Sequence, residues 1–194
     1  MNVDVRRLTP GVFFVSHGSG LGGEIIRHAT GSWAGHAGLY LGGGQMVEGA
    51  PPEARIVHAD KYGDAIWAWR MWDQLKTSSW TDQEIRAAQL RVTGRGHALV
   101  GCAYDWPAYV GFALEVLNLR SEKQLSPFFR HDTYRVCSAL VDDAETFGGV
   151  PMTFTAEDGP GLERDPSVKV ATPYMANLVS PGMLLGLAQR SEWL

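Results

Sequence analysis

The chain has 194 residues, a length at which one domain can bury a core without disulfides or metals, so we expect a single domain over residues 1–194. Hydrophobic residues make up 45% and charged residues 20%, a composition that excludes an intrinsically disordered chain. The net charge of −4 and an isoelectric point near 5.8 exclude nucleic acid as a main partner, because phosphate binding requires a basic surface.

We expect neither a secretory signal nor an integral membrane segment. The first ten residues lack a charged region followed by an apolar one. The apolar stretch from Trp106 to Leu119 is interrupted by Glu115 and is too short for a bilayer. The expectation is therefore a chain that starts in the cytoplasm of its maker, and delivery as a phage or effector component stays open.

The first part of the chain predicts the beginning of a sheet. A buried strand is expected at Val12–Ser16, then a flexible turn at 18–23 that lacks the elements of a phosphate-binding loop, then a short helix at Glu24–Ala29. Alternation predicts strands at His36–Leu41 and Gln45–Gly49, joined as a hairpin across three glycines.

Two further strands are expected at Arg55–His58 and Ala65–Trp72, the second with tryptophans mostly at strand period. The capping-box pattern Thr81-Asp82-Gln83-Glu84 then predicts a helix that runs to about Thr93. Its apolar face is expected to consist of Ile85, Leu90 and Val92.

The second half predicts mostly helices. One is expected at Trp106–Leu119 and another at Tyr134–Phe147, capped by Asp132 or Thr133. The region Val150–Val170, rich in proline, glycine and charge, predicts a long loop, and Ala171–Leu187 is apolar with Pro181 as an interruption. The predicted class is α+β, an antiparallel sheet packed against helices.

The sequence has two cysteines, Cys102 and Cys137, and no cysteine–histidine cluster with zinc spacing, so we expect no metal and no cofactor. Cys102 is expected to be a small buried apolar residue. A disulfide between the two would require the fold to bring them together, which the sequence does not show.

Cys137 and His36 are candidates for a nucleophile and its base. Cys137 is expected at the start of a helix, where the helix dipole and unpaired N–H groups lower a thiol pKa and hold a developing oxyanion. His36 lies on its strand between Gly35 and Gly38, whose small size leaves room for a substrate. From spacing alone, an inert buried cysteine and an ordinary histidine explain the pattern equally well.

A third polar group is needed to orient the imidazole. Glu48 is an acid in an otherwise apolar strand, and the predicted hairpin places it within cross-strand reach of the His36 region. The alternative, a glutamate that faces solvent, fits the pattern as well.

Four segments together resemble the circularly permuted NlpC/P60 superfamily: Thr30–Gly42, Val47–Ala50, Ala103–Trp106 and Val136–Val141. More narrowly, they are similar to the YiiX/YaeF-like permuted papain-fold amidases, whose wider relatives include the lecithin:retinol acyltransferases. In that family the histidine strand precedes the cysteine helix, as it does here. The resemblance covers most of the chain and implies a circularly permuted papain-like fold.

The resemblance implies a catalytic triad in which Cys137 is the nucleophile, His36 the general base and Glu48 the polar third residue. It also implies that Tyr104 lies beside the active site and assists the oxyanion. Tyr109 and Tyr134 compete for that position. The serine that often precedes the family's histidine is Gly35 here, which we expect to alter local hydrogen bonding without abolishing activity.

The implied function is that of a cysteine hydrolase, a thiol protease or amidase that cleaves an amide bond through a thioacyl-enzyme. Peptidoglycan peptides are the implied substrates, and with no basic wall-binding module in the sequence, targeting would require a partner in a larger assembly. Two alternatives stay open. One is a lipid acyltransferase or thioesterase, with Trp106–Leu119 as its apolar patch; the other is a non-catalytic structural domain.

Overall fold

The computed structural model describes residues 7–62, 65–68, 70–77, 79–105, 134–150 and 180–190. The strands are β1 (Phe13–Ser16), β2 (His36–Gly42), β3 (Gln45–Ala50), β4 (Glu53–His58), β5 (Ile66–Trp67), β6 (Ala103–Tyr104) and β7 (Tyr134–Arg135). The helices are α1 (Gly20–Thr30), α2 (Met71–Thr77), α3 (Asp82–Ala98), α6 (Cys137–Gly148) and α7 (Pro181–Arg190), and η2 (Ala59–Lys61) is a 3-10 turn.

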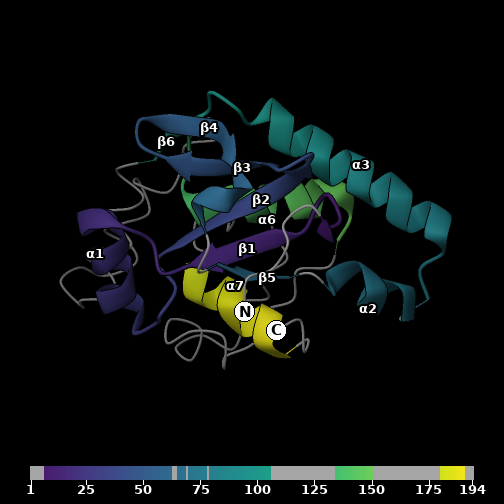
Figure 1. The fold of residues 1–194 in the computed structure, drawn as a ribbon, viewed down its shortest axis with the longest axis horizontal. Helices are drawn as coiled ribbons and strands as arrows, with labels where there is room; N and C mark the ends of the chain where they lie inside the picture. The colour runs from purple at the N-terminus through teal and green to yellow at the C-terminus, as the bar shows by residue number, and fades with distance from the viewer. Residues whose placement is uncertain are drawn as a thin grey trace, which may run out of the picture.

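The strands form one seven-stranded sheet in the order β5–β1–β2–β3–β4–β6–β7 (Figure 1). All neighbouring strands are antiparallel except β6 and β7, which are parallel at one edge. Helix α6 packs on β2 and β3, α3 packs on β2 and α6, and α7 contacts β1, β2 and α6. The predicted α+β class is confirmed.

The β2–β3 hairpin is the part of the sheet that positions the site. The structure confirms the predicted pairing, with Gly38 opposite Glu48 and Leu39 opposite Val47. Its turn uses Gly42, Gly43 and Gly44 at φ values of 99°, 60° and 78°, where a side chain would be strained. A second hairpin continues β3 into β4 and places Glu48 opposite Arg55.

Two expectations for the first half of the chain are wrong. Residues 20–23, expected in a flexible turn, form the first turn of α1, with Ser19 at the N-cap position. The stretch Ala65–Trp72 is not one strand, because only Ile66–Trp67 pairs with β1 and α2 begins at Met71. Met71 and Trp72 are buried, but they belong to a helix. An apolar run this short is compatible with either a strand or a helix.

Helix α3 begins as predicted, with the capping box between Thr81 and Glu84 present, but it continues to Ala98 rather than ending near Thr93. Leu90 is 74% exposed and does not belong to the apolar face. Ile85 and Val92 are buried as expected, and Ala88 lies with them.

Helix α6 starts at Cys137 rather than at Tyr134, because residues 134–135 pair with β6 as a strand. Pro181 opens α7 instead of interrupting a helix, a position at which its missing N–H costs nothing.

The predicted helix Trp106–Leu119, the caps Asp132 and Thr133, and the predicted loop beyond Val150 lie outside the described residues. Among the helices that are described, none has the length and apolar character needed to cross a membrane.

Candidate active site

His36 is the first residue of β2, and aromatic rings hold its imidazole on two sides. The ring of Tyr62 stacks on it at 5.4 Å between centroids with an interplanar angle of 29°. Phe14 of β1 meets it edge-on at 6.2 Å. The side chain is 14% exposed, so the imidazole has little rotational freedom and retains a small opening to solvent.

Cys137 is the first residue of α6 and is buried, with 1% of its surface exposed. The preceding residue, Val136, has no polar side-chain atom and makes no capping hydrogen bond, so the side chain at the N-cap does not satisfy the first N–H groups of the helix. The His36 imidazole and the backbone N–H groups of Ala37 and Ser138 act on the thiol, where each of them favours its thiolate form.

Gly49 of β3 allows this helix start to approach the sheet. A Cβ at Gly49 would lie 3.0 Å from Cys137 Cα and 3.1 Å from its backbone nitrogen, which is tighter than most Cβ contacts in proteins. The absence of a side chain at this position therefore fixes how near the nucleophile lies to the strand that carries Glu48.

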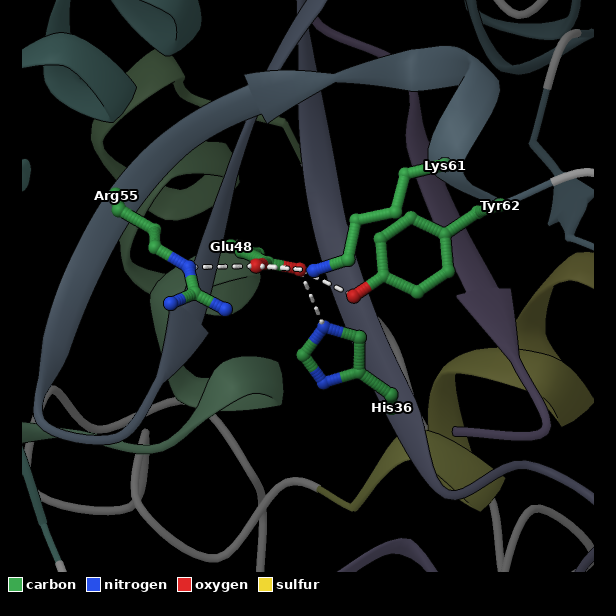
Figure 2. A network of polar contacts seen from close by, with 5 residues as sticks. All are labelled: His36, Glu48, Arg55, Lys61 and Tyr62. Carbon is green, nitrogen blue, oxygen red and sulfur yellow. Dashed lines mark hydrogen bonds and ion pairs between the residues drawn. The ribbon is translucent and has the colours of Figure 1, made fainter. Parts of the chain in front are cut away.

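Glu48 is completely buried and is held by four side chains from the surrounding strands and turn (Figure 2). His36 Nε2 lies 3.2 Å from Oε2, the atom that also accepts the hydroxyl of Tyr62. Arg55 Nε and Lys61 Nζ donate to Oε1 at 2.9 and 2.7 Å. Because Glu48 occupies Nε2 of the imidazole, Nδ1 is the ring nitrogen that is left for the Cys137 thiol.

The pKa shifts of the three groups favour a charged network. Burial opposes ionisation of His36, but hydrogen bonds and attraction to Cys137 and Glu48 outweigh it and raise the His36 pKa to about 9. Burial likewise raises the pKa of the Cys137 thiol, but the imidazole and two backbone N–H groups lower it below its ordinary value. Donation from His36, Lys61 and Tyr62 overcomes burial and lowers the pKa of Glu48.

These side chains line a cavity of about 150 Å³. One wall comes from the start of α1 and the loop before it, and includes Gly22 and Gly23. Tyr104 of β6 forms part of another wall, is 8% exposed and packs against Ile26 of α1. The structure thus places all four predicted site residues, His36, Glu48, Tyr104 and Cys137, around one cavity. Tyr109 lies outside the described residues.

Sequence reasoning missed Arg55, Lys61 and Tyr62. One signal for Arg55 was available, because a turn at Pro51-Pro52 places Glu48 and Arg55 directly opposite each other, as an acid and a base on paired strands. Lys61 is the last residue of a 3-10 turn and Tyr62 follows it, and no local pattern indicates the direction of this turn.

Cys102 lies apart from the site. It is half-buried at the edge of the core rather than fully buried as expected, and both cysteines are free thiols. Within the described part of the chain, no group of three or more histidines, cysteines and acids is arranged to hold a metal ion.

Comparison of the sequence with protein-family models and with curated proteins finds no match. The likeness to the permuted NlpC/P60 superfamily therefore depends on the quoted sequence segments alone and stays a proposal.

Proposed function

We propose that this chain is a cysteine hydrolase of the amidase or endopeptidase type, with a circularly permuted papain-like fold of the NlpC/P60 kind. The observation that carries the proposal is a buried Cys137 thiol that interacts with the His36 imidazole, whose Nε2 lies 3.2 Å from Glu48, all on the wall of one cavity. A thiol beside a positioned base and an orienting acid is an arrangement for nucleophilic acyl transfer.

In the proposed reaction, His36 holds the proton of the Cys137 thiol, and the sulfur attacks the carbonyl carbon of an amide. The C–N bond of the tetrahedral intermediate breaks, and the imidazolium gives its proton to the departing amine, which leaves a thioester on Cys137. His36 then takes a proton from water as the water attacks the thioester. The acid product departs, and the sulfur recovers its proton. Glu48 holds the imidazole in the tautomer and orientation that both steps require.

Oxyanion stabilisation is assigned to the first turn of α6. The first N–H groups of this helix adjoin the Cys137 thiol, and the helix dipole favours the negative charge that develops on the carbonyl oxygen when sulfur attacks. The hydroxyl of Tyr104, which also lines the cavity, is the proposed additional donor.

Peptidoglycan peptides are the proposed substrate class, as the resemblance implies, with delivery by a larger assembly. The decisive experiment incubates the purified chain with muropeptides and identifies products by mass spectrometry. Wild-type protein and a Cys102→Ala variant are expected to give two fragments whose masses add up to that of the substrate plus one water. Cys137→Ala is expected to give no fragments.

Hydrolysis that survives in Cys137→Ala contradicts the mechanism. Intact-mass measurement of the protein separates the alternatives, because a long-chain acyl group on Cys137 indicates lipid acyl transfer. A Cys137 that iodoacetamide does not alkylate near neutral pH indicates a structural domain.

A further inference from the structure

Two cationic side chains lie on the wall of the cavity that contains the nucleophile. Arg55 of β4 and Lys61 of η2 both line it, and their side chains are 49% and 44% exposed. Figure 2 shows Arg55 joined to Glu48 through Nε alone. No other hydrogen bond to a described residue holds its guanidinium, so two terminal nitrogens remain for a ligand.

The charges of these groups do not cancel. Arg55 and Lys61 carry two positive charges against the single negative charge of Glu48, which is the only carboxylate among the described residues that line the cavity. The Cys137–His36 pair adds no net charge, because it is neutral both as thiol with imidazole and as thiolate with imidazolium. One positive charge therefore remains in the cavity of a chain whose net charge is −4.

The remaining donors suit a carboxylate better than other anions. A guanidinium presents parallel N–H groups at the spacing of two carboxylate oxygens, and the lysine adds a second charge-assisted donor. A single surplus positive charge balances one carboxylate, whereas a phosphate monoester brings nearly two negative charges near neutral pH. Glu48 cannot serve these nitrogens as well, because both of its oxygens are already occupied.

We propose that Arg55 and Lys61 form a subsite for a carboxylate group of the substrate, placed beside the acyl group that Cys137 attacks. The substrate class is thus narrowed to amides that carry a carboxylate close to the scissile bond. The assignment rests on the proposed function for the place of that bond, but the subsite itself is testable without turnover.

The test compares two alkylating reagents of similar size, the anion iodoacetate and the neutral iodoacetamide, at Cys137. Both require the thiolate, so the ratio of their second-order rate constants removes differences in thiol reactivity. Relative to the same ratio for N-acetylcysteine, we expect iodoacetate to be favoured about tenfold at Cys137, the value of one charge-assisted hydrogen bond. Arg55→Gln and Lys61→Gln are each expected to remove most of that preference.

The matched control is Arg86→Gln, which removes one positive charge from the exposed face of α3 and is expected to leave the ratio unchanged. Cations that only support Glu48 would slow both reagents equally when replaced, with no change in the ratio. A wild-type ratio no higher than that of N-acetylcysteine, or one unchanged in both cavity variants, overturns the proposal.

A second measurement decides the subsite even if Cys137 reacts with neither reagent, a result that would count against the proposed function instead. The Cys137→Ala protein is titrated with N-acetylglycine and with its neutral amide N-acetylglycinamide at constant ionic strength. A rise in Tm with the acid only, lost when Arg55→Gln is added, supports the subsite. Equal responses to the two ligands overturn it.

Discussion

Glu48 and Glu145 are both completely buried, yet they differ in every contact that decides their charge. Glu48 on β3 receives four donors and its pKa is lowered. Glu145, in the last turn of α6, has no hydrogen-bond partner among the described residues for either carboxylate oxygen. Burial, and to a smaller extent the nearby Asp142, raise the pKa of Glu145 well above its ordinary value.

The difference shows that burial alone does not set the charge of an acid in this fold. A carboxyl without partners escapes the cost of desolvation by keeping its proton, whereas a carboxyl with donors stays ionised in the same degree of burial. The charged acid lies at the cavity, where its charge can act on His36. The neutral acid lies in the helix that carries the nucleophile, as part of the packing.

The largest expected effect follows from removing the charge of Glu48. Glu48→Gln keeps the shape of the side chain, but the His36 imidazolium loses the carboxylate that stabilises it, which weakens the activation of the Cys137 thiol by His36. Hydrolysis and alkylation of Cys137 are expected to slow on the order of 10²- to 10⁴-fold, measured as kcat/KM and as the iodoacetamide rate constant. The control Glu53→Gln changes an exposed glutamate on β4 and is expected to have no effect. Equal rates in wild type and Glu48→Gln would contradict the assigned role.

The pH dependence of activity tests the charge that Glu48 maintains on His36. Because the pKa of His36 is raised to about 9, the imidazolium that protonates the leaving group is present at neutral pH and is lost as pH rises through about 9. Activity is therefore expected to fall on that alkaline limb. NMR titration of the His36 ring should show the same midpoint, moved to lower pH in Glu48→Gln. A midpoint near the ordinary value of 6.5 in wild type would refute the charged network.

A smaller effect is expected for Glu145→Gln, and this substitution should stabilise the protein rather than impair it. The unfolded chain ionises this group above about pH 4.5, while the folded protein keeps it protonated, so its contribution to stability declines as pH rises above that value. Glu145→Gln removes the decline. The free energy of unfolding of Glu145→Gln should therefore rise relative to that of wild type by up to about 1.4 kcal/mol for each pH unit, until Glu145 of the folded wild-type protein ionises. Denaturant unfolding at several pH values measures the gain, and a constant difference would contradict it.

The smallest expected effect concerns Tyr62. Tyr62→Phe keeps the ring stacked on His36 and removes only the hydroxyl that donates to Glu48, with an expected loss of about 1 kcal/mol of stability and a several-fold loss of activity. Tyr40→Phe is the matched control, since the buried Tyr40 hydroxyl accepts a hydrogen bond from Gly44 N away from the site. Tyr40→Phe should lower stability without slowing the alkylation of Cys137. Similar slowing in both variants would assign Tyr62 to packing alone.

The structure was predicted best from the sequence where a repeating apolar pattern is followed by residues that form a defined turn. Alternation at His36–Leu41, three glycines and an apolar strand with one acid were sufficient to predict the hairpin and to place Glu48 near His36. The capping box likewise predicted where α3 begins. These features depend on neighbours in the chain, whose geometry is local.

Features that depend on distant contacts were not predicted. Two glycines near the end of α3 do not stop the helix, because Gly96 packs on Leu39 of the sheet and needs to be small. Trp72 is a buried helix residue rather than a strand residue, because strand β5 has only two residues and α2 begins at Met71. Lys61 reaches Glu48 only because η2 turns the chain back over the sheet, so a side chain that resembles an ordinary surface lysine belongs to the cavity.

Glu48 and Gly49 are consecutive residues of β3, and alternation points them to opposite faces of the sheet. The first carries the acid to His36, and the second makes room for the helix that carries Cys137. A slip of β3 by one residue would exchange these faces, bury an acid against the helix start and remove it from the imidazole. Chains in the wrong register would keep their strands and helices but lose the activated sulfur. The fraction of rapidly alkylated Cys137 in a preparation therefore counts the molecules whose hairpin paired correctly, a quantity to which circular dichroism is insensitive.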